Sequence, residues 1–500
     1  MSIVAGILNT LAGLLVIALV FGAASIVVIF FLDRQQSSNA VRRNYPVVGR
    51  LRSLFEHLGE FFRQYFFALD REELPFNRAQ RNWVGRAAKG DSRTIAFGST
   101  RELSPEGTII FENTQFPVLE SDIAEAEPIC FGPLCDKPYE APSFFNISAM
   151  SYGSLSQPAI TALSLGAAKA GIWLNTGEGG LSEHHLAGDC DIIFQIGTAN
   201  YGVRSKDGAL DDAALKAVSQ HDAVKMIELK LAQGAKPGKG GILPANKVTA
   251  EISRIRGIPE GEASHSPNRH PDIASIDELL AKIAHLKRVS GLPVGFKTVA
   301  GSLAWMDDLA AAIHLQDEES RPDFITLDSA DGGTGAAPQS LMDYLGLPIR
   351  ESLPALVDAL DRHSLRPRVR VIASGKMLLP SEVSWALAMG ADAINCARGF
   401  MFSLGCIQAL KCNKNTCPTG ITTHREDLQR GLVPRVKADH VAQFASAIRH
   451  DVGVIAHSCG AASPSHLQRH HVRMVIDENQ SINLAVRYPP VDQAKSAGKT

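Results

Sequence analysis

The sequence carries almost no excess of charge of either sign and few aromatic residues. Its 500 residues contain 50 Lys and Arg against 52 Asp and Glu, a formal net charge of −2. Nucleic-acid-binding domains normally have a basic excess, so nucleic acid is excluded as a partner class. Hydrophobic residues make up 45% and charged residues 20%, which indicates a globular protein.

Cysteine is scarce and unevenly placed. Eight Cys in 500 residues do not make a disulfide scaffold, and they indicate a reducing compartment. Three of them, Cys406, Cys412 and Cys417, fall within twelve positions. Their spacing is not that of two-cluster ferredoxins, and no fourth Cys or paired His nearby suits structural zinc. Grouped thiolates predict an iron–sulfur cluster, and three ligands favour [3Fe–4S]. The alternative is three unrelated thiols or one nucleophile.

Charge is absent from residues 3–32, where Val, Ile, Leu, Ala and Phe dominate. About 20 such residues span a bilayer as a helix. A cleaved signal peptide would begin with basic residues and have a shorter apolar core, so we expect a retained single-pass anchor in the inner membrane. Five Arg follow between residues 34 and 52, which predicts that the catalytic bulk faces the cytoplasm. Residues 54–67 are amphipathic and aromatic, which predicts a helix at the membrane surface or one docked on the main domain.

A dinucleotide-binding glycine motif is missing after the first apolar segment, and this disfavours a doubly wound sheet. Instead, short apolar segments alternate with helical patterns from about residue 141, which indicates parallel β/α units. Roughly 280 residues of this pattern fit a (β/α)8 TIM barrel. The candidate strands are residues 144–149, 172–175, 225–231, 293–297, 323–327, 369–373 and 392–396.

We therefore predict an α/β fold, a (β/α)8 TIM barrel with an N-terminal transmembrane helix. The expected domains are residues 1–33 (anchor), 34–140 (juxtamembrane helical and cap region), 141–440 (barrel with the cysteine loop) and 441–500 (C-terminal helical tail). Residues 233–271 form a long insertion rich in Gly, Pro and His. An insertion of this length predicts an active-site loop.

Charged side chains follow two of the predicted strands, where barrels place their chemistry. Glu178 lies among three glycines after residues 172–175, and a carboxylate on an open loop suits an amine or ammonium group. Lys230 shares the inward face of its strand with Glu228, where a charge is costly unless it is paired or functional. The loop that follows predicts a carboxylate- or phosphate-binding site, with Gln233, Lys236, Lys239 and, further along, Arg256.

Glycine-rich turns follow the later strands and indicate a flat, phosphorylated ligand. Lys297 closes the segment 293–297, where a cation could stabilise a reduced flavin. The run 328–335 ends in Gly333, Thr334 and Gly335, which permit close approach of the backbone to a ligand. Residues 371–375 and 395–399 would be the seventh and eighth strand ends, the pair at which barrels often bind phosphate.

In combination these motifs resemble the FMN-binding domain of the glutamate synthase family, in its short membrane-anchored form. The matching runs are residues 149–156, 175–180, 233–241, 331–336 and the cysteine run that ends in Cys-Pro-Thr-Gly at 417–420. They occur in the family's order across about residues 145–420.

The resemblance implies a barrel with FMN at its C-terminal mouth and a [3Fe–4S] cluster on Cys406, Cys412 and Cys417. The implied reaction is the reduction of 2-iminoglutarate, formed from 2-oxoglutarate and ammonia, to L-glutamate. The implied flavin residues are Met150, Ser151, Lys297, Gly333, Thr334, Gly335, Ser374, Gly375 and Gly399, to which the residues themselves add Arg398 as a cation for the phosphate at the eighth strand end. The implied substrate residues are Glu178, Lys230, Lys236 and Arg256, to which the anion-binding loop adds Gln233. Of these sets, Glu178, Lys230 and Lys297 are the expected catalytic residues.

The chain also departs from the family pattern. Ile242 stands where the family usually has Gln, which removes a hydrogen-bonding group near the substrate; another amino or 2-oxo acid is therefore an alternative substrate. The family's N-terminal glutaminase domain is missing, so ammonia would come from solution or from a glutaminase partner. Electrons would come from a ferredoxin-like or other donor protein. Two further alternatives are a barrel of the IMP dehydrogenase type and a non-catalytic scaffold or electron-transfer subunit.

Overall fold

The computed structural model describes residues 2–489 and residue 491. It consists of two compact units, Met1–Gln80 and Arg81–Thr500. Residue 1 of the predicted anchor, and residues 490 and 492–500 of the predicted tail, lie outside the described residues.

The first unit begins with one long apolar helix, α1 (Ser2–Gln35). By length and composition, Val4–Gln35 is a candidate membrane span. The chain folds back after it, because the Asp33 carboxylate accepts hydrogen bonds from the Arg50 guanidinium (2.7 Å) and the Val47 backbone N–H (3.0 Å). The helices that follow are α2 (Ala40–Asn44), α3 (Val48–Phe62) and a π-helical turn (Arg63–Phe67). Residues 54–67 are therefore helical, as predicted.

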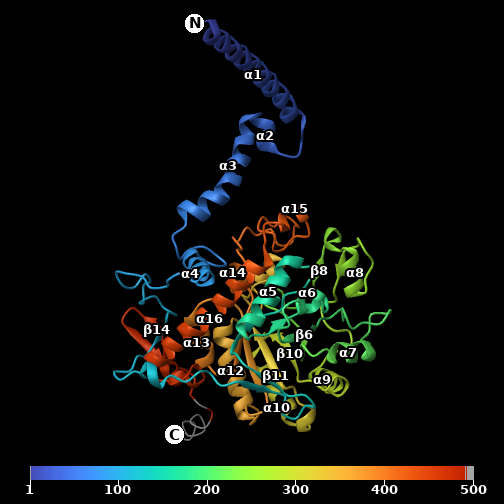
Figure 1. Cartoon of the computed structure of the whole chain (residues 1–500), viewed down its shortest axis with the longest axis vertical. Coiled ribbons are helices and arrows are strands. Elements are labelled where there is room, and N and C mark those ends of the chain that lie inside the picture. The colour runs from blue at the N-terminus through green and yellow to red at the C-terminus, as the bar shows by residue number, and fades with distance from the viewer. Residues whose placement is uncertain (1, 490, 492–500) are drawn as a thin grey trace. The chain divides into compact units, whose positions relative to one another are not determined.

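The second unit is built on a closed barrel of eight strands, and every neighbouring pair is parallel (Figure 1). The strands in chain order are β4 (Phe145–Ile147), β5 (Leu174–Asn175), β6 (Ile192–Ile196), β7 (Val224–Lys230), β10 (Val294–Val299), β11 (Phe324–Asp328), β12 (Arg370–Ser374) and β13 (Ala393–Cys396). The last strand closes the barrel by pairing Asn395 with Asn146 of the first. The predicted TIM barrel is confirmed, although β6 was not among the seven predicted strands.

Helices follow most of the strands, and the longer ones lie around the barrel (Figure 1). The helices after the strands are α5 (Gln157–Ala170), α6 (Glu183–Leu186), α7 (Asp212–Ser219), α9 (Ile276–Ser290), α10 (Leu303–His314), α11 (Gln339–Met342), α12 (Ile349–Arg362), α13 (Pro380–Ala388) and α14 (Arg398–Ser403), and α15 (Glu426–Gln429) comes after the cysteine loop. Local signals explain several boundaries: Ser156 caps the start of α5, and Gly171 ends it in the left-handed conformation that glycine tolerates.

Aromatic side chains close the barrel at the amino ends of its strands. A hairpin of β2 (Ile129–Phe131) and β3 (Tyr139–Ala141) places Phe131 there. The Phe131 ring meets Trp173 and Phe324 edge to face, each with ring centroids 5.8 Å apart. Full burial of one such side chain contributes about 1.5–3 kcal/mol. With this end filled, the open end of the barrel is the carboxyl end of its strands.

The C-terminal segment packs on the side of the barrel. Helix α16 (Pro434–Ser458) lies along α5, and Gly166 permits this because a side chain there would collide with Val441. The tail, which was expected to be helical, also contains β14 (Val472–Asp477), β15 (Gln480–Asn483) and α17 (Leu484–Arg487). Strand β14 pairs with β1 (Ile109–Phe111). That partner lies more than 350 residues earlier, so local sequence carried no sign of the pairing. Helix α4 (Arg78–Lys89) precedes β1.

The insertion at residues 233–271 contains short elements of its own. Strand β8 (Ile242–Leu243) pairs with β9 (Ser264–His265), and between them lie a 3-10 turn (Ala245–Lys247) and α8 (Ala250–Arg256).

Candidate active site

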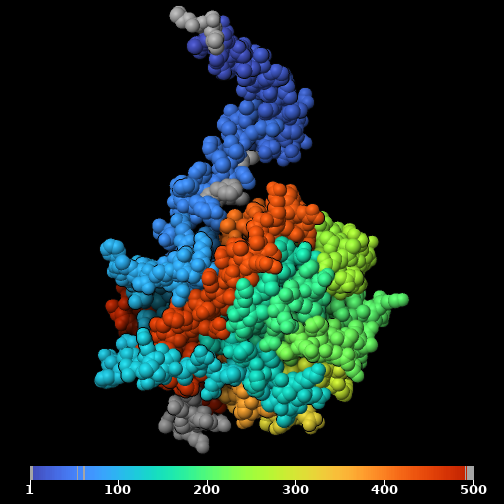
Figure 2. All heavy atoms as spheres, viewed as in Figure 1, coloured from blue at the N-terminus to red at the C-terminus, as the bar shows by residue number. Residues whose placement is uncertain are grey.

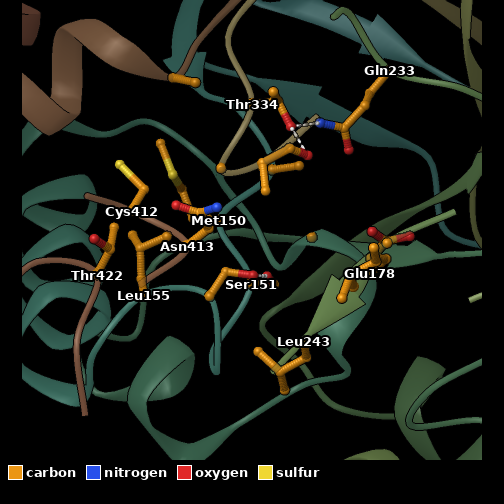
Figure 3. Close-up of a pocket in the computed structure, with 18 of the residues that line it drawn as sticks. Met150, Ser151, Leu155, Glu178, Gln233, Leu243, Thr334, Cys412, Asn413 and Thr422 are labelled. Atoms are coloured by element: carbon orange, nitrogen blue, oxygen red, sulfur yellow. Dashed lines mark hydrogen bonds between the residues drawn. The ribbon is translucent and has the colours of Figure 1, made fainter. Parts of the chain in front are cut away.

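A pocket opens at the carboxyl ends of the barrel strands. Its wall includes Met150, Glu178, Gln233, Thr334 and Cys412, which follow β4, β5, β7, β11 and β13 respectively (Figure 3). Figure 3 shows Cys412 and Met150 together on one side and Glu178 on the other. Gln233 donates a hydrogen bond from Nε2 to Thr334 Oγ1 (3.1 Å) along a third side. The fold thus gathers five loops that lie far apart in sequence.

An ion pair between Glu178 and Lys230 lies in this pocket. Lys230 ends β7, and its Nζ lies 2.8 Å from Glu178 Oε1 and 2.6 Å from Gln233 Oε1. Burial raises the pKa of Glu178, but the charges of Lys230, Lys236 and Arg256 outweigh burial and bring that pKa down to about 2. Glu178 is therefore a carboxylate at neutral pH, as its predicted role requires.

Further cations line the same pocket, and Lys236 and Arg256 are those that act on Glu178. Lys236 is 8% exposed; burial and the nearby charge of Lys230 lower its pKa to about 8, against the opposing effect of Glu178. Arg256 ends α8 and donates from Nη2 to the Tyr152 carbonyl (3.0 Å), while its buried Nε has no hydrogen-bond partner in the described part of the chain. With Lys230, three cations face one carboxylate, and the pocket suits a ligand with more than one carboxylate group.

A buried polar network lies in the barrel below this pocket. Glu228 is 1% exposed and accepts hydrogen bonds from Asn175 (2.8 Å), Gln195 (2.6 Å) and Thr326 (2.5 Å). These donors satisfy a carboxylate that would otherwise be costly to bury. Gln195 belongs to β6, which was not predicted from the sequence. The available signal was the mainly apolar run at residues 192–196, followed by Gly197.

Lys297 lies at the same level of the barrel. Its Nζ is 3.1 Å from Asp328 Oδ2. Burial acts to lower the pKa of Lys297, but the charges of Asp328 and Glu228 outweigh burial and raise it. Lys297 is thus a permanent cation beside the ligand pocket. Asp328 also accepts the Gly234 backbone N–H (2.9 Å), which joins this ion pair to the loop after β7. Asp328 was not among the predicted site residues, although it closes the apolar strand β11.

Most of the predicted flavin residues line this pocket and an adjoining cavity. The second cavity is bounded by Lys297, Ser374, Gly375 and Arg398, and the two cavities share Gly333. Gly375 has φ +117°, and a side chain there would collide with Ser329. At Gly333 a Cβ would lie 2.8 Å from Arg398 Nε. Gly375 thus gives the second cavity backbone that only glycine adopts readily, and the lack of a side chain at Gly333 leaves room for Arg398; both features fit the close approach of a flat, phosphorylated cofactor.

Gly399 has a different position. A side chain there would lie 2.6 Å from Phe444 Cζ, so the residue is small because α16 packs against it. Its predicted flavin contact could come only from its backbone.

The cysteine loop follows α14 and reaches the same pocket through Cys412. All three cysteines are free thiols. The Arg398 guanidinium donates from Nη2 to the Thr334 carbonyl, and its Nη1 lies 4.0 Å from Cys412 Sγ. Burial raises the pKa of Cys406. At Cys417 burial acts in the same direction, but hydrogen bonds from Thr419 and Thr422 outweigh it and lower the pKa.

The donor set of this loop fits an iron–sulfur cluster better than a single ion. Among the described residues, three potential metal-ligand atoms lie within 4.8 Å of one another only at Glu183, His184 and Glu251. The sulfurs of the three loop cysteines therefore do not all lie within 4.8 Å of one another. Sulfur ligands of one zinc ion at about 2.3 Å would lie closer together than this. Three free thiols beside a guanidinium suit an anionic cluster with several irons.

An eight-stranded barrel with this charged mouth is the architecture of a TIM-barrel enzyme. Residues 105–462 match the family model described as the conserved region in glutamate synthase. The chain belongs to the glutamate synthase family, and its homologues support a glutamate synthase-like oxidoreductase.

Three relatives illustrate the extent of the similarity. The glutamate synthase large subunit-like protein YerD of Bacillus subtilis is 38% identical over 511 residues, which cover 94% of this chain and 97% of YerD. The archaeal glutamate synthase [NADPH] of Methanocaldococcus jannaschii is 35% identical, across 66% of this chain and 61% of that protein. The archaeal-type glutamate synthase [NADPH] of Thermotoga maritima is 33% identical, across 64% of this chain and 60% of that protein. The match thus spans less than two thirds of the two archaeal-type proteins.

Proposed function

We propose that this protein forms L-glutamate, or a closely similar amino acid, by reducing the 2-imino acid that arises from a 2-oxo acid and ammonia. The observation that carries the proposal is the Glu178–Lys230 pair, which lies beside Lys236 and Arg256 in a pocket that also reaches Cys412. One cavity then contains cations that can bind carboxylates, a carboxylate that can bind a nitrogen atom, and a cysteine loop that can hold an electron-carrying cluster.

The chain's own residues have separate roles in this proposal. Lys236 and Arg256 bind the carboxylates of 2-oxoglutarate, and Gln233 holds Lys230 toward the same ligand through its 2.6 Å hydrogen bond. Glu178 binds the ammonium or imine nitrogen, because it stays ionised. Lys230, paired with Glu178, is placed to hold or return a proton at the reacting nitrogen. Burial of these groups excludes water, which would hydrolyse an imine.

Two cofactors would supply the redox chemistry. FMN would be held by Met150, Ser151, Lys297, Gly333, Thr334, Gly335, Ser374, Gly375, Arg398 and Gly399, and a [3Fe–4S] cluster by Cys406, Cys412 and Cys417. When bound, the flavin would supply hydride chemistry and the cluster would supply one-electron chemistry. Lys297 provides a positive charge that stabilises a negatively charged ligand on the barrel axis.

The proposal includes a membrane location and protein partners. Helix α1 would anchor the chain in the inner membrane, with the barrel on the cytoplasmic side, where five Arg follow the apolar segment. A ferredoxin-like or other donor protein would provide electrons. Ammonia would come from solution or from a glutaminase partner.

Flavin reoxidation by the purified full-length protein tests this function. The protein is reduced anaerobically and mixed with ammonia and one 2-oxo acid at a time, and flavin absorbance and amino-acid product are followed. We expect reoxidation and product that require both ammonia and the 2-oxo acid. A scaffold would bind flavin but form no product. An enzyme of the IMP dehydrogenase type would contain no iron.

A further inference from the structure

Lys247 is a buried lysine that the proposed reaction does not use. It ends the 3-10 turn Ala245–Lys247 of the insertion and is 2% exposed. Its Nζ donates to the carbonyl oxygens of Ser154 (3.3 Å), Cys412 (3.0 Å) and Thr422 (2.7 Å). An ammonium group has three N–H donors, so each has an acceptor. Lys247 thereby joins the insertion to the turn after β4 and to both ends of the segment that contains Cys412 and Cys417.

The charge of Lys247 has no carboxylate beside it. All three acceptors are neutral carbonyls, and no carboxylate forms an ion pair with this lysine in the part of the chain that the structure describes. Burial of an unpaired charge is costly, and buried cations normally have an anionic partner. Two of its three acceptors, the carbonyls of Cys412 and Thr422, bracket the segment that contains Cys412 and Cys417. An anionic group bound by those thiols would lie close to the ammonium group and supply the missing counter-charge.

A further contact joins the insertion to the cysteine loop beside this lysine. Asn415 donates from Nδ2 to the carbonyl of Asn246 (3.2 Å), the neighbour of Lys247, and Thr423 holds Asn415 by donating to its carbonyl (2.8 Å). Figure 2 shows the orange surface around α15 beside the yellow-green surface around α8. Arg398 contacts the sulfur of Cys412, whereas Lys247 contacts its carbonyl. Two cations from different segments, Arg398 and Lys247, thus contact Cys412.

We propose that Lys247 is a positioning residue that supplies the buried positive counter-charge for the cluster on Cys406, Cys412 and Cys417. The inference rests on the proposed function, because the cluster is part of it. A fixed cation in a low-dielectric site favours the addition of an electron to an anionic group nearby. Lys247 therefore raises the reduction potential of the cluster, in addition to holding the shape of the loop.

Redox titration of full-length variants in detergent tests this role. Lys247→Met removes the charge and the donors, Lys247→Gln removes the charge but keeps an amide donor, and Lys247→Arg keeps the charge. The matched control is Lys169→Met, since Lys169 pairs with Asp439 at the exposed α5–α16 contact. Iron content, the optical and EPR spectra of the cluster and its midpoint potential are measured for each.

We expect both neutral variants to titrate at more negative potentials than the wild type. A tenfold change in the one-electron equilibrium corresponds to about 59 mV, and we expect at least that shift for Lys247→Met. Lys247→Arg should shift by much less, and Lys169→Met should match the wild type. Neutral variants that keep the wild-type midpoint would overturn the proposal.

Loss of the cluster is also decisive. If both neutral variants lose iron while Lys247→Arg retains it, and circular dichroism shows all of them folded, the charge is required and the proposal stands. If all three Lys247 variants lose iron equally, the side-chain shape matters and the charge does not. Wild-type protein without iron would refute the proposed cofactor itself, whereas iron-loaded wild type with an unshifted Lys247→Met refutes only the role of Lys247.

Discussion

Lys230 Nζ lies 2.8 Å from Glu178 Oε1, and the two side chains are only 10% and 17% exposed. The two residues are separated by 52 positions; Glu178 follows β5 and Lys230 ends β7, so the closed barrel alone brings them together. Because the pair neutralises itself, the charges of Lys236 and Arg256 remain for an anionic ligand. This relationship organises the candidate site, and four predictions follow from it and its neighbours.

Replacement of Glu178 by Gln should remove most of the activity. The amide keeps the size of the side chain but leaves three buried cations without their carboxylate and cannot hold an ammonium group. We expect kcat/KM for ammonia-dependent amino-acid formation to fall at least about 100-fold, the lower range for loss of an acid–base group. Glu183→Gln is the control, because Glu183 lies five residues after Glu178 and its side chain is exposed; this variant should keep the wild-type activity. Equal activity of the wild type and Glu178→Gln would contradict the assignment.

Binding of the 2-oxo acid should weaken above pH 8. The pKa of Lys236 is lowered to about 8, so its charge is present below that pH and is lost as the pH rises through it. An anionic ligand then loses one cationic contact. KM for the 2-oxo acid, measured between pH 6 and 10, should rise above pH 8. Lys236→Arg should move this rise to higher pH, because arginine stays charged; an unchanged profile in that variant would argue against Lys236.

Gly375 should not tolerate a side chain. Its φ of +117° is unfavourable for other residues, and a Cβ would collide with Ser329. Gly375→Ala should therefore lower the free energy of unfolding by at least about 2 kcal/mol, in the range of backbone strain at such positions. Gly335→Ala is the matched control, since a Cβ there meets nothing within 4 Å. Thermal denaturation of both variants measures the difference; a Gly375→Ala protein as stable as the control would contradict the structure.

Ile242 should influence the choice of substrate. Its side chain lines the pocket from β8 and is 50% exposed, where the family usually has a hydrogen-bonding Gln. Ile242→Gln should raise kcat/KM for 2-oxoglutarate about fivefold relative to 2-oxo acids with apolar side chains, because one polar contact contributes on the order of 1 kcal/mol. Ile242→Leu keeps the apolar surface and should leave the ratio unchanged. A ratio that responds to neither substitution would show that Ile242 does not contact the substrate.

Much of the fold could be predicted from the sequence, and there is a physical reason why strand β6 was not predicted. Seven of the eight barrel strands were recognised because apolar segments ended in glycine or charged turns. The residues of β6 are all buried, so the segment shows no alternation, and periodicity could not separate it from a buried helix; the one local signal of a strand end was Gly197. The error carried over to the site, since Gln195 on β6 binds Glu228.

The sequence by itself determined which chemical groups are available: an apolar segment long enough for a membrane span, three grouped thiols, and glycines and charges at strand ends. Those features depend on local composition and spacing. Only the tertiary structure decided the partners, such as Lys230 for Glu178, Asp328 for Lys297 and three carbonyls for Lys247. A closed parallel barrel brings the carboxyl ends of all its strands to one mouth, and these contacts between distant loops have no signature in local sequence.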